Sequence, residues 1–135
     1  MNDKICLNSH TIKENEIWYA VKHINKNIRM NSRSGGVFTA ISDYVLESGG
    51  RIYGCKTTED FLAIHTYADT KEERDDFRGS KYIQSDMGDT FENVLKDLKE
   101  NRKVLFSGTP CQVAALKKYV TITCADYQKN LILLD

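Results

Sequence analysis

The sequence predicts an α/β fold: a single domain with a mixed, partly parallel sheet flanked by helices. Strand-like and helix-like segments alternate along most of the chain, which is typical of this class. The last segments read as strand, helix and strand at 104–106, 110–120 and 131–134, an order that predicts a parallel pair joined by a right-handed crossover. With 135 residues, one proline and no Ser/Gly-rich linker, the chain has the size of one domain.

The first third of the chain predicts one strand and one helix. Residues 1–15 are polar and aperiodic, and we expect a loose lead-in there, with the domain proper at 16–135. Apolar and other residues alternate around 17–21, which favours a strand. Ser34-Gly35-Gly36 then introduces an amphipathic helix that Gly49-Gly50 ends. Its expected apolar stripe is Val37, Ile41, Tyr44 and Val45.

The middle of the chain predicts a hairpin followed by a long loop. Residues 51–56 and 62–67 read as strands, and the polar turn at 57–60 joins them as a hairpin. Residues 78–88 are polar and contain two glycines, so we expect a loop with a short extended piece.

Two more helices are predicted from their N-terminal capping patterns. Thr70 with Glu73 forms a capping box that opens a short helix ending near Phe77, and its charged run is expected to be a solvated face. Asp89 with Glu92 forms a similar pattern before the next helix. The apolar face of that helix is expected to be Phe91, Val94, Leu95 and Leu98.

The most informative segment follows the buried strand at 104–106. Thr109 is a good helix N-cap, Pro110 suits the first helical position, and Gln112 completes a capping box. Cys111 is therefore expected in the first turn of a helix, where the partial positive charge favours a thiolate that can act as nucleophile or metal ligand. A buried, inert cysteine at a strand–helix corner is the alternative interpretation.

Three polar, glycine-containing segments could together form a ligand pocket. They are 32–36, 78–85 and 107–112, and the first and last lead directly into helices, whose starts favour anions such as phosphate. Lys81 and Arg78 could add positive charge beside a phosphate, and Tyr82 could stack on a flat ring. Each segment also has a plain interpretation as a cap, a turn or a solvated loop. The usual nucleotide-binding motifs are not present.

Composition excludes several classes of function. Acidic and basic residues balance at 19 each, so nothing suggests binding to nucleic acid. Apolar runs are too short for a membrane span, and a start without an apolar leader favours the cytoplasm. Four widely spaced cysteines do not predict a self-contained zinc site, and we expect Cys55 to be a small packed residue. The histidines are interpreted as surface or satisfied structural residues: His10, His23 and His65.

Five segments, in order and at matching spacing, resemble the coenzyme F-420 hydrogenase/dehydrogenase beta-subunit family. They are 18–22, 32–38, 49–54, 78–85 and 104–112. The resemblance runs from about residue 16 to the end of the chain and corresponds to the family's N-terminal domain. It implies an iron–sulfur flavoprotein oxidoreductase that moves electrons between FAD, a [4Fe-4S] cluster and a deazaflavin (coenzyme F-420) or ferredoxin partner, with further subunits as possible partners.

The resemblance also implies roles for particular residues. Cys111 is the expected cluster ligand, which agrees with the thiolate argument above. The flavin is expected to be held by Ser34, Gly35, Gly36, Ser80, Lys81, Tyr82, Gln84, Gly108, Thr109 and Gln112.

Two departures from the family pattern limit this expectation. Arg33 stands where the family usually has the middle serine of its Ser-Ser-Ser-Gly-Gly motif. The sequence ends at Asp135, before the family's next motif and C-terminal domain, and only Cys111 matches a family cysteine although such a cluster takes four ligands. We therefore expect the cluster only in a longer enzyme. A folded, cofactor-free module that docks a partner remains an alternative. A thiol enzyme using Cys111 is a weaker one, since no histidine lies near it in sequence.

Overall fold

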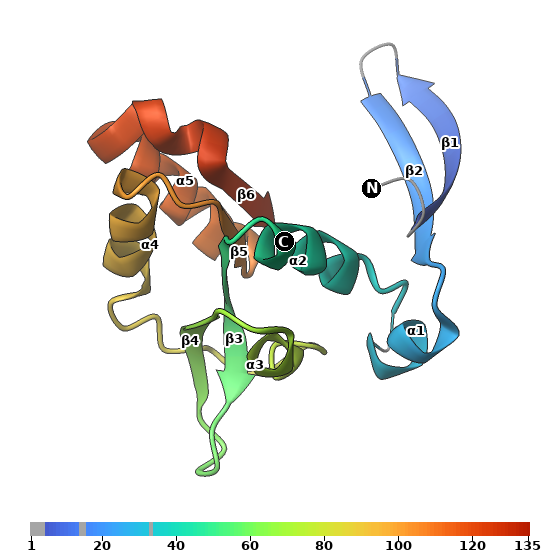
Figure 1. Ribbon diagram of the computed structural model, residues 1–135, viewed down its shortest axis with the longest axis horizontal. Coiled ribbons are helices and arrows are strands. Elements are labelled where there is room, and N and C mark those ends of the chain that lie inside the picture. The colour runs from blue at the N-terminus through green and yellow to red at the C-terminus, as the bar shows by residue number, and fades with distance from the viewer. Residues whose placement is uncertain (1–4, 14–15, 33) are drawn as a thin grey trace.

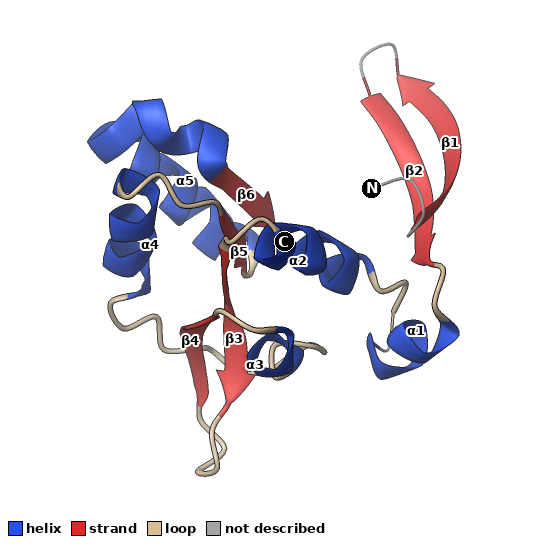
Figure 2. Cartoon of the chain, in the orientation of Figure 1, coloured by secondary structure: helices blue, strands red, loops and turns tan. Residues whose placement is uncertain are grey.

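The computed structural model is an α/β domain in which helices flank a mixed sheet, with a separate hairpin at the N-terminus (Figures 1 and 2). The structure describes the backbone of residues 5–13, 16–32 and 34–135, and side chains from residue 19 onward except 33. This architecture confirms the predicted fold class.

The main sheet has four strands in the order β4-β3-β5-β6. β3 (Arg51–Thr57) and β4 (Ala63–Ala68) form the predicted antiparallel hairpin. β5 (Val104–Ser107) pairs in parallel with β3, and β6 (Leu131–Leu134) pairs in parallel with β5. The carboxyl ends of β3, β5 and β6 therefore lie at one edge of the sheet, where ligands bind in open α/β folds.

Helices cover both faces of this sheet. α2 (Val37–Glu47) and the segment after α3 (Lys71–Asp75) pack on one face, with Ile52 and Leu105. α4 (Thr90–Lys99) and α5 (Pro110–Cys124) pack on the other, and a short 3-10 helix at Ala125–Asn130 leads from α5 to β6. The two hydrophobic clusters thus lie on opposite faces of the central strands.

Successive side chains of a strand point to opposite faces of the sheet, so β5 contributes to both hydrophobic clusters. Val104 and Phe106 face α4 and α5, where they meet Leu116, whereas Leu105 faces α2 and meets Val45. All five side chains are fully buried. Burying a side chain of this size contributes about 1.5 to 3 kcal/mol, so this short strand stabilises both layers.

The N-terminal segment differs from the prediction. β1 (Ile5–Lys13) pairs with β2 (Glu16–His23) in a two-stranded antiparallel sheet that stands apart from the main sheet (Figure 1). The expected loose lead-in is therefore wrong for 5–13, because pairing with β2 satisfies its backbone groups. The predicted strand at 17–21 exists, but in this hairpin. The remainder of the expected lead-in, residues 1–4 and 14–15, lies outside the described residues.

A helix that the sequence analysis did not predict follows the hairpin. α1 (Lys26–Ser32) begins after Asn25, whose side-chain oxygen accepts hydrogen bonds from the backbone N–H groups of Asn27 at 2.9 Å and Ile28 at 3.4 Å. Asparagine in this position is a favoured N-cap. The signal was present in the sequence but lacked an apolar stripe to accompany it.

The buried face of α2 is more polar than predicted. Tyr44 is 43% exposed, whereas Thr39, Ser42 and Asp43 are buried. The reason is Arg74 of α3, which is 2% exposed and donates to Thr39 O at 3.2 Å, to Asp43 Oδ1 at 2.9 Å and to Ser42 Oγ. The expected solvated face at 71–76 is therefore wrong at Arg74.

The two helix starts with acidic boxes behave differently. At α3 both halves of the box form: Thr70 Oγ1 accepts from Glu73 N–H at 3.2 Å, and Glu73 Oε2 accepts from Thr70 N–H at 3.2 Å. At α4 Asp89 is the N-cap residue, but its side chain makes no capping hydrogen bond within the described part of the chain. Thr90 N–H instead donates to Met87 O at 2.9 Å, so the predicted side-chain cap is wrong there.

Candidate functional site

The three polar loops singled out in the sequence meet around one pocket at the carboxyl edge of the sheet. This inter-loop pocket has a volume of about 760 Å³ and is lined by Ser32, Ser34, 77–85, 107–110 and Gln112 together with strand residues. Its place outside the ends of β3 and β5 is the usual ligand position in open α/β sheets. The predicted residues that line it are Ser34, Ser80, Lys81, Tyr82, Gln84, Gly108, Thr109 and Gln112.

Gly35 and Gly36 serve a different contact. Gly35 O accepts a hydrogen bond from His23 N–H at 2.6 Å, and a Cβ at Gly35 would lie 2.8 Å from Val21 O. Gly36 has φ 80° and begins α2, and a Cβ there would lie 2.9 Å from His23 Cβ. These glycines let the chain pass close to β2, and neither lines the inter-loop pocket.

Cys111 lies beside the pocket, in the first turn of α5, and is exposed. Its Sγ lies 3.1 Å from Thr109 Oγ1, and Gln112 Oε1 accepts from Thr109 N–H at 2.9 Å, as the predicted capping box requires. Among the residues that the structure describes, no group of three or more His, Cys, Asp or Glu side chains is placed to hold a metal ion. Cys55, which lines the pocket, and Cys124 are also free thiols.

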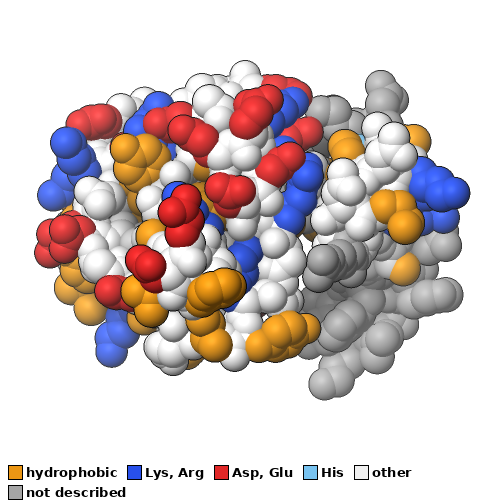
Figure 3. All heavy atoms as spheres, turned by 90° about the horizontal axis from the view of Figure 1, so that it is seen from below, with side chains coloured by type: hydrophobic (Ala, Val, Ile, Leu, Met, Phe, Trp, Pro, Cys, Tyr) orange, Lys and Arg blue, Asp and Glu red, His pale blue; other side chains and the backbone are white. Residues whose placement is uncertain are grey.

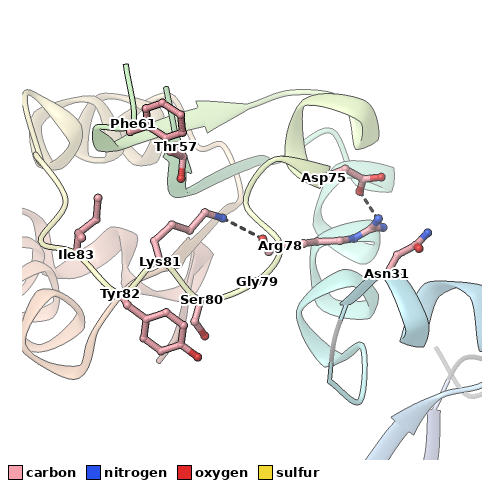
Figure 4. A pocket seen from close by; sticks show the side chains of 10 residues that line it. All are labelled: Asn31, Thr57, Phe61, Asp75, Arg78, Gly79, Ser80, Lys81, Tyr82 and Ile83. Carbon is pink, nitrogen blue, oxygen red and sulfur yellow. Dashed lines mark hydrogen bonds and ion pairs between the residues drawn. The ribbon is translucent and has the colours of Figure 1, made fainter. Parts of the chain in front are cut away.

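The two cations of the 78–85 loop are already paired within the protein. Lys81 Nζ donates to Arg78 O at 3.0 Å (Figure 4). It also donates to Asp76 O at 2.9 Å, and burial lowers the Lys81 pKa. Arg78 pairs with Asp75 at 2.8 Å and donates to Thr39 Oγ1 at 3.2 Å. These contacts hold the loop against α2 and α3, so they fix the conformation of the loop where it lines the pocket.

The floor of the pocket contains residues that sequence reasoning missed. His65 lies directly opposite Cys55 in the β3–β4 hairpin and stacks on Phe106, with ring centroids 5.4 Å apart. His65 Nδ1 is 2.8 Å from Ser85 Oγ, and burial lowers the His65 pKa. Burial also raises the pKa of the Cys55 thiol, although the nearby Lys81 ammonium opposes this. His65 was correctly interpreted as satisfied, but only the strand register places it in the pocket.

A second hollow, the outer pocket, shares the 78–83 loop with the inter-loop pocket and has a volume of about 670 Å³ (Figure 4). Tyr82 is 95% exposed and Phe61, at the hairpin turn with φ 60°, is 82% exposed, so both rings face solvent. Figure 3 shows such exposed hydrophobic side chains among interspersed acidic and basic ones. Across the described ranges, the helices are all too short or too polar to span a bilayer.

The fold and the pocket define an α/β domain with a loop-lined site at the carboxyl ends of its parallel strands. Its fold is similar to a chain in a structure of the F420-reducing [NiFe] hydrogenase complex from Methanosarcina barkeri, with a TM-score of 0.63 and 21% identity. The match covers 82% of this chain and 39% of that chain, and at this identity the likeness concerns the fold. No family model and no curated protein matches the sequence.

Proposed function

We propose that this chain is a flavin-binding domain of a redox protein, with FAD in the inter-loop pocket. In a complete enzyme it would move electrons between FAD, a [4Fe-4S] cluster and a deazaflavin or ferredoxin partner. The observation that most supports the proposal is the convergence of residues 34, 80–84, 107–110 and 112, distant in sequence, on one pocket. The fold's likeness to a chain of an F420-reducing hydrogenase complex agrees with a redox role.

The residues present fit a flavin. A volume of about 760 Å³ is within the usual range for cofactor sites, about 300 to 1,000 Å³. The lining combines the hydroxyls of Ser34, Ser80 and Thr109 with the apolar rings of Phe38 and Phe77. Hydroxyls at the starts of α2 and α5 suit phosphate or ring carbonyl groups, and the apolar rings suit the flat ring system.

Each lining group has a distinct task in this proposal. The Tyr82 ring is almost fully exposed and would stack on one face of the flavin or its adenine. Gln84 would donate and accept hydrogen bonds at the ring edge, and Lys81 would keep a positive charge near the phosphates while holding the loop. The bound flavin would supply the hydride or electron transfer, and the protein would orient it and shield it from water.

The described residues do not fit a [4Fe-4S] cluster by themselves. Cys111 offers one exposed thiol, whereas the cluster takes four cysteine thiolates as a rule. Within the described residues, no group of three or more His, Cys, Asp or Glu side chains is placed to bind a metal. We therefore derive no step through a cluster, and Cys111 is proposed only as one of its ligands in a longer protein.

The experiment that tests the proposal is flavin retention. The protein is purified anaerobically, mixed with FAD and desalted, and its visible absorption spectrum is recorded. Retained flavin bands are expected. A colourless protein would contradict the flavin site and favour the alternative, a cofactor-free module that docks a partner.

A pair of tyrosine variants makes the test specific. Tyr82→Ala is expected to weaken FAD binding about twofold to tenfold, because ring stacking contributes about 0.5 to 1.5 kcal/mol. Tyr44→Ala removes another exposed tyrosine ring that lies outside the pocket, against Lys103. Equal affinities of the two variants would contradict the stacking role of Tyr82.

A further inference from the structure

A closed ring of hydrogen bonds lies at the floor of the inter-loop pocket. Thr109 N–H donates to Gln112 Oε1 at 2.9 Å, and Gln112 Nε2 donates to Ser85 Oγ at 3.0 Å. Ser85 Oγ lies 2.8 Å from His65 Nδ1, and His65 Nε2 lies 3.2 Å from Ser107 O. The peptide chain from Ser107 to Thr109 closes the ring, so the turn between β5 and α5 is held at both ends.

The chemistry of the end groups determines the direction of every bond in this ring. Ser107 O can only accept, so His65 Nε2 carries the proton, and Nδ1 of the neutral ring accepts from the Ser85 hydroxyl. Thr109 N–H can only donate, which assigns the Gln112 oxygen to it and the amide nitrogen to Ser85. All four hydrogen bonds therefore run the same way around the ring.

Burial makes these bonds depend on one another. His65 and Ser85 are each 8% exposed, and hydrogen bonds in series polarise each other in a low-dielectric environment. Burial lowers the His65 pKa, which keeps the neutral form that this direction requires. The glycine at 108 leaves room for one of these bonds, since a Cβ there would lie 2.9 Å from Gln112 Oε1, the acceptor for Thr109 N–H.

We propose that His65 is a positioning residue of the pocket: through Ser85 and Gln112 it fixes the turn at 107–109 and with it the first turn of α5, where Cys111 lies. The polar groups of the ring are used within the protein, so His65 acts on a ligand only through the wall that it holds. Gln112, expected from the sequence to contact flavin, acts here as a link of the ring. The ring itself is independent of the ligand, and only the affinity readout below rests on the proposed function.

Gln112→Glu tests whether the ring transmits an effect to His65. A carboxylate at 112 still accepts from Thr109 N–H but cannot donate to Ser85, so the Ser85 hydroxyl turns toward it. His65 Nδ1 then loses its donor and is stabilised as N–H⁺, donating to Ser85. The expected result is a higher His65 pKa than in the wild type, measured by nitrogen-15 NMR of the imidazole.

A second background separates this transmission from simple charge attraction. Gln112→Glu in the Ser85→Ala background adds the same charge without the link. We expect it to raise the His65 pKa above that of Ser85→Ala by less than Gln112→Glu alone raises it above that of the wild type. The other ionisable residues around His65 are Cys55 opposite it, Lys81 beside Cys55, and Asp86. The backbone carbonyl of Asp86 accepts from the backbone N–H of His65. These residues are the same in each variant. Equal rises in both backgrounds, or an Nδ1–H tautomer in the wild type, would overturn the proposal.

The affinity for FAD gives the functional readout. Ser85→Ala breaks the ring and is expected to weaken FAD binding about tenfold, as loss of a supporting hydrogen bond behind a ligand site commonly does. Ser48→Ala removes a hydroxyl bonded to Val45 O outside the pocket and is expected to leave affinity unchanged. Equal affinity of both variants would overturn the positioning role. A wild-type protein that binds no FAD would refute the proposed function instead, and the NMR experiment would still decide the ring.

Discussion

Replacing Arg74 by methionine should strongly destabilise the protein, because Arg74 belongs to a buried ion pair. Arg74 Nη2 lies 2.9 Å from Asp43 Oδ1, and its side chain is 2% exposed. The same guanidinium donates to Thr39 O and Ser42 Oγ on α2. Methionine keeps the length of the apolar stem but leaves Asp43 and these acceptors without their donor.

The magnitude follows from burial. Removing one partner of a buried ion pair costs about 3 to 5 kcal/mol, because the remaining charge is left uncompensated. Lys71 Nζ lies 3.6 Å from Asp43 Oδ2, but its side chain is 46% exposed, and such a pair contributes at most about 1 kcal/mol. We therefore expect a loss near the lower end of the range, about 3 kcal/mol.

Urea unfolding followed by circular dichroism at neutral pH measures this loss. Arg102→Met is the matched control, since Arg102 is 31% exposed and pairs with Asp69 at 3.4 Å. It also lies 3.7 Å from the buried Asp97, but Asp97 keeps its hydrogen bonds from Arg51 and Tyr53, so we expect a cost of less than about 1 kcal/mol. Adding Asp43→Asn to Arg74→Met should cost less than the sum of the single changes, because it removes the buried charge. A loss at Arg74 no larger than at Arg102 would refute the argument.

Three further predictions use the same unfolding measurement. Gly108→Ala should cost about 1 to 3 kcal/mol by overpacking, since the new Cβ would lie 2.9 Å from Gln112 Oε1; an unchanged midpoint would contradict the geometry of the turn. Leu116→Ala should cost about 2 to 5 kcal/mol because Leu116 is fully buried, whereas Ile122→Ala, at a position 75% exposed, should cost much less; similar losses would be inconsistent with the described packing of α5. Burial lowers the His65 pKa below its ordinary value of 6.5, so the unfolded chain binds its proton first as the pH falls. The stability that neutral His65 contributes is complete above pH 6.5 and declines below it toward the lowered pKa, and His65→Gln should lack this decline; an identical pH dependence of variant and wild type would disprove it.

The sequence was most informative where local chemistry decides the structure. The box at Thr70 and the Pro110 start of α5 were predicted from short-range rules, and both helices begin there. The same rules failed at Asp89, where a backbone carbonyl replaces the side-chain cap. They also missed Arg74, because a charge run at a helix start reads as solvated unless the polar face that it contacts on α2 is known.

The candidate site shows the same division. The sequence identified the three loops, and eight of the proposed flavin-binding residues line the pocket at which these loops meet. Gly35 and Gly36 do not line the pocket; they let the chain approach β2 closely. His65 and Cys55 enter the pocket because the β3–β4 register sets them opposite each other, a long-range relation that no local pattern contains.

By itself, the sequence determined the α/β class, most element boundaries and the loops that carry polar and glycine residues, because turn chemistry, capping and apolar periodicity act over a few residues. Only the tertiary structure decided which faces those elements share. Strand order brings the ends of β3 and β5 to one edge, and the same packing places Ser85 within hydrogen-bonding distance of both His65 and Gln112. Both effects depend on contacts between residues far apart in the chain, where packing rather than propensity selects the partner.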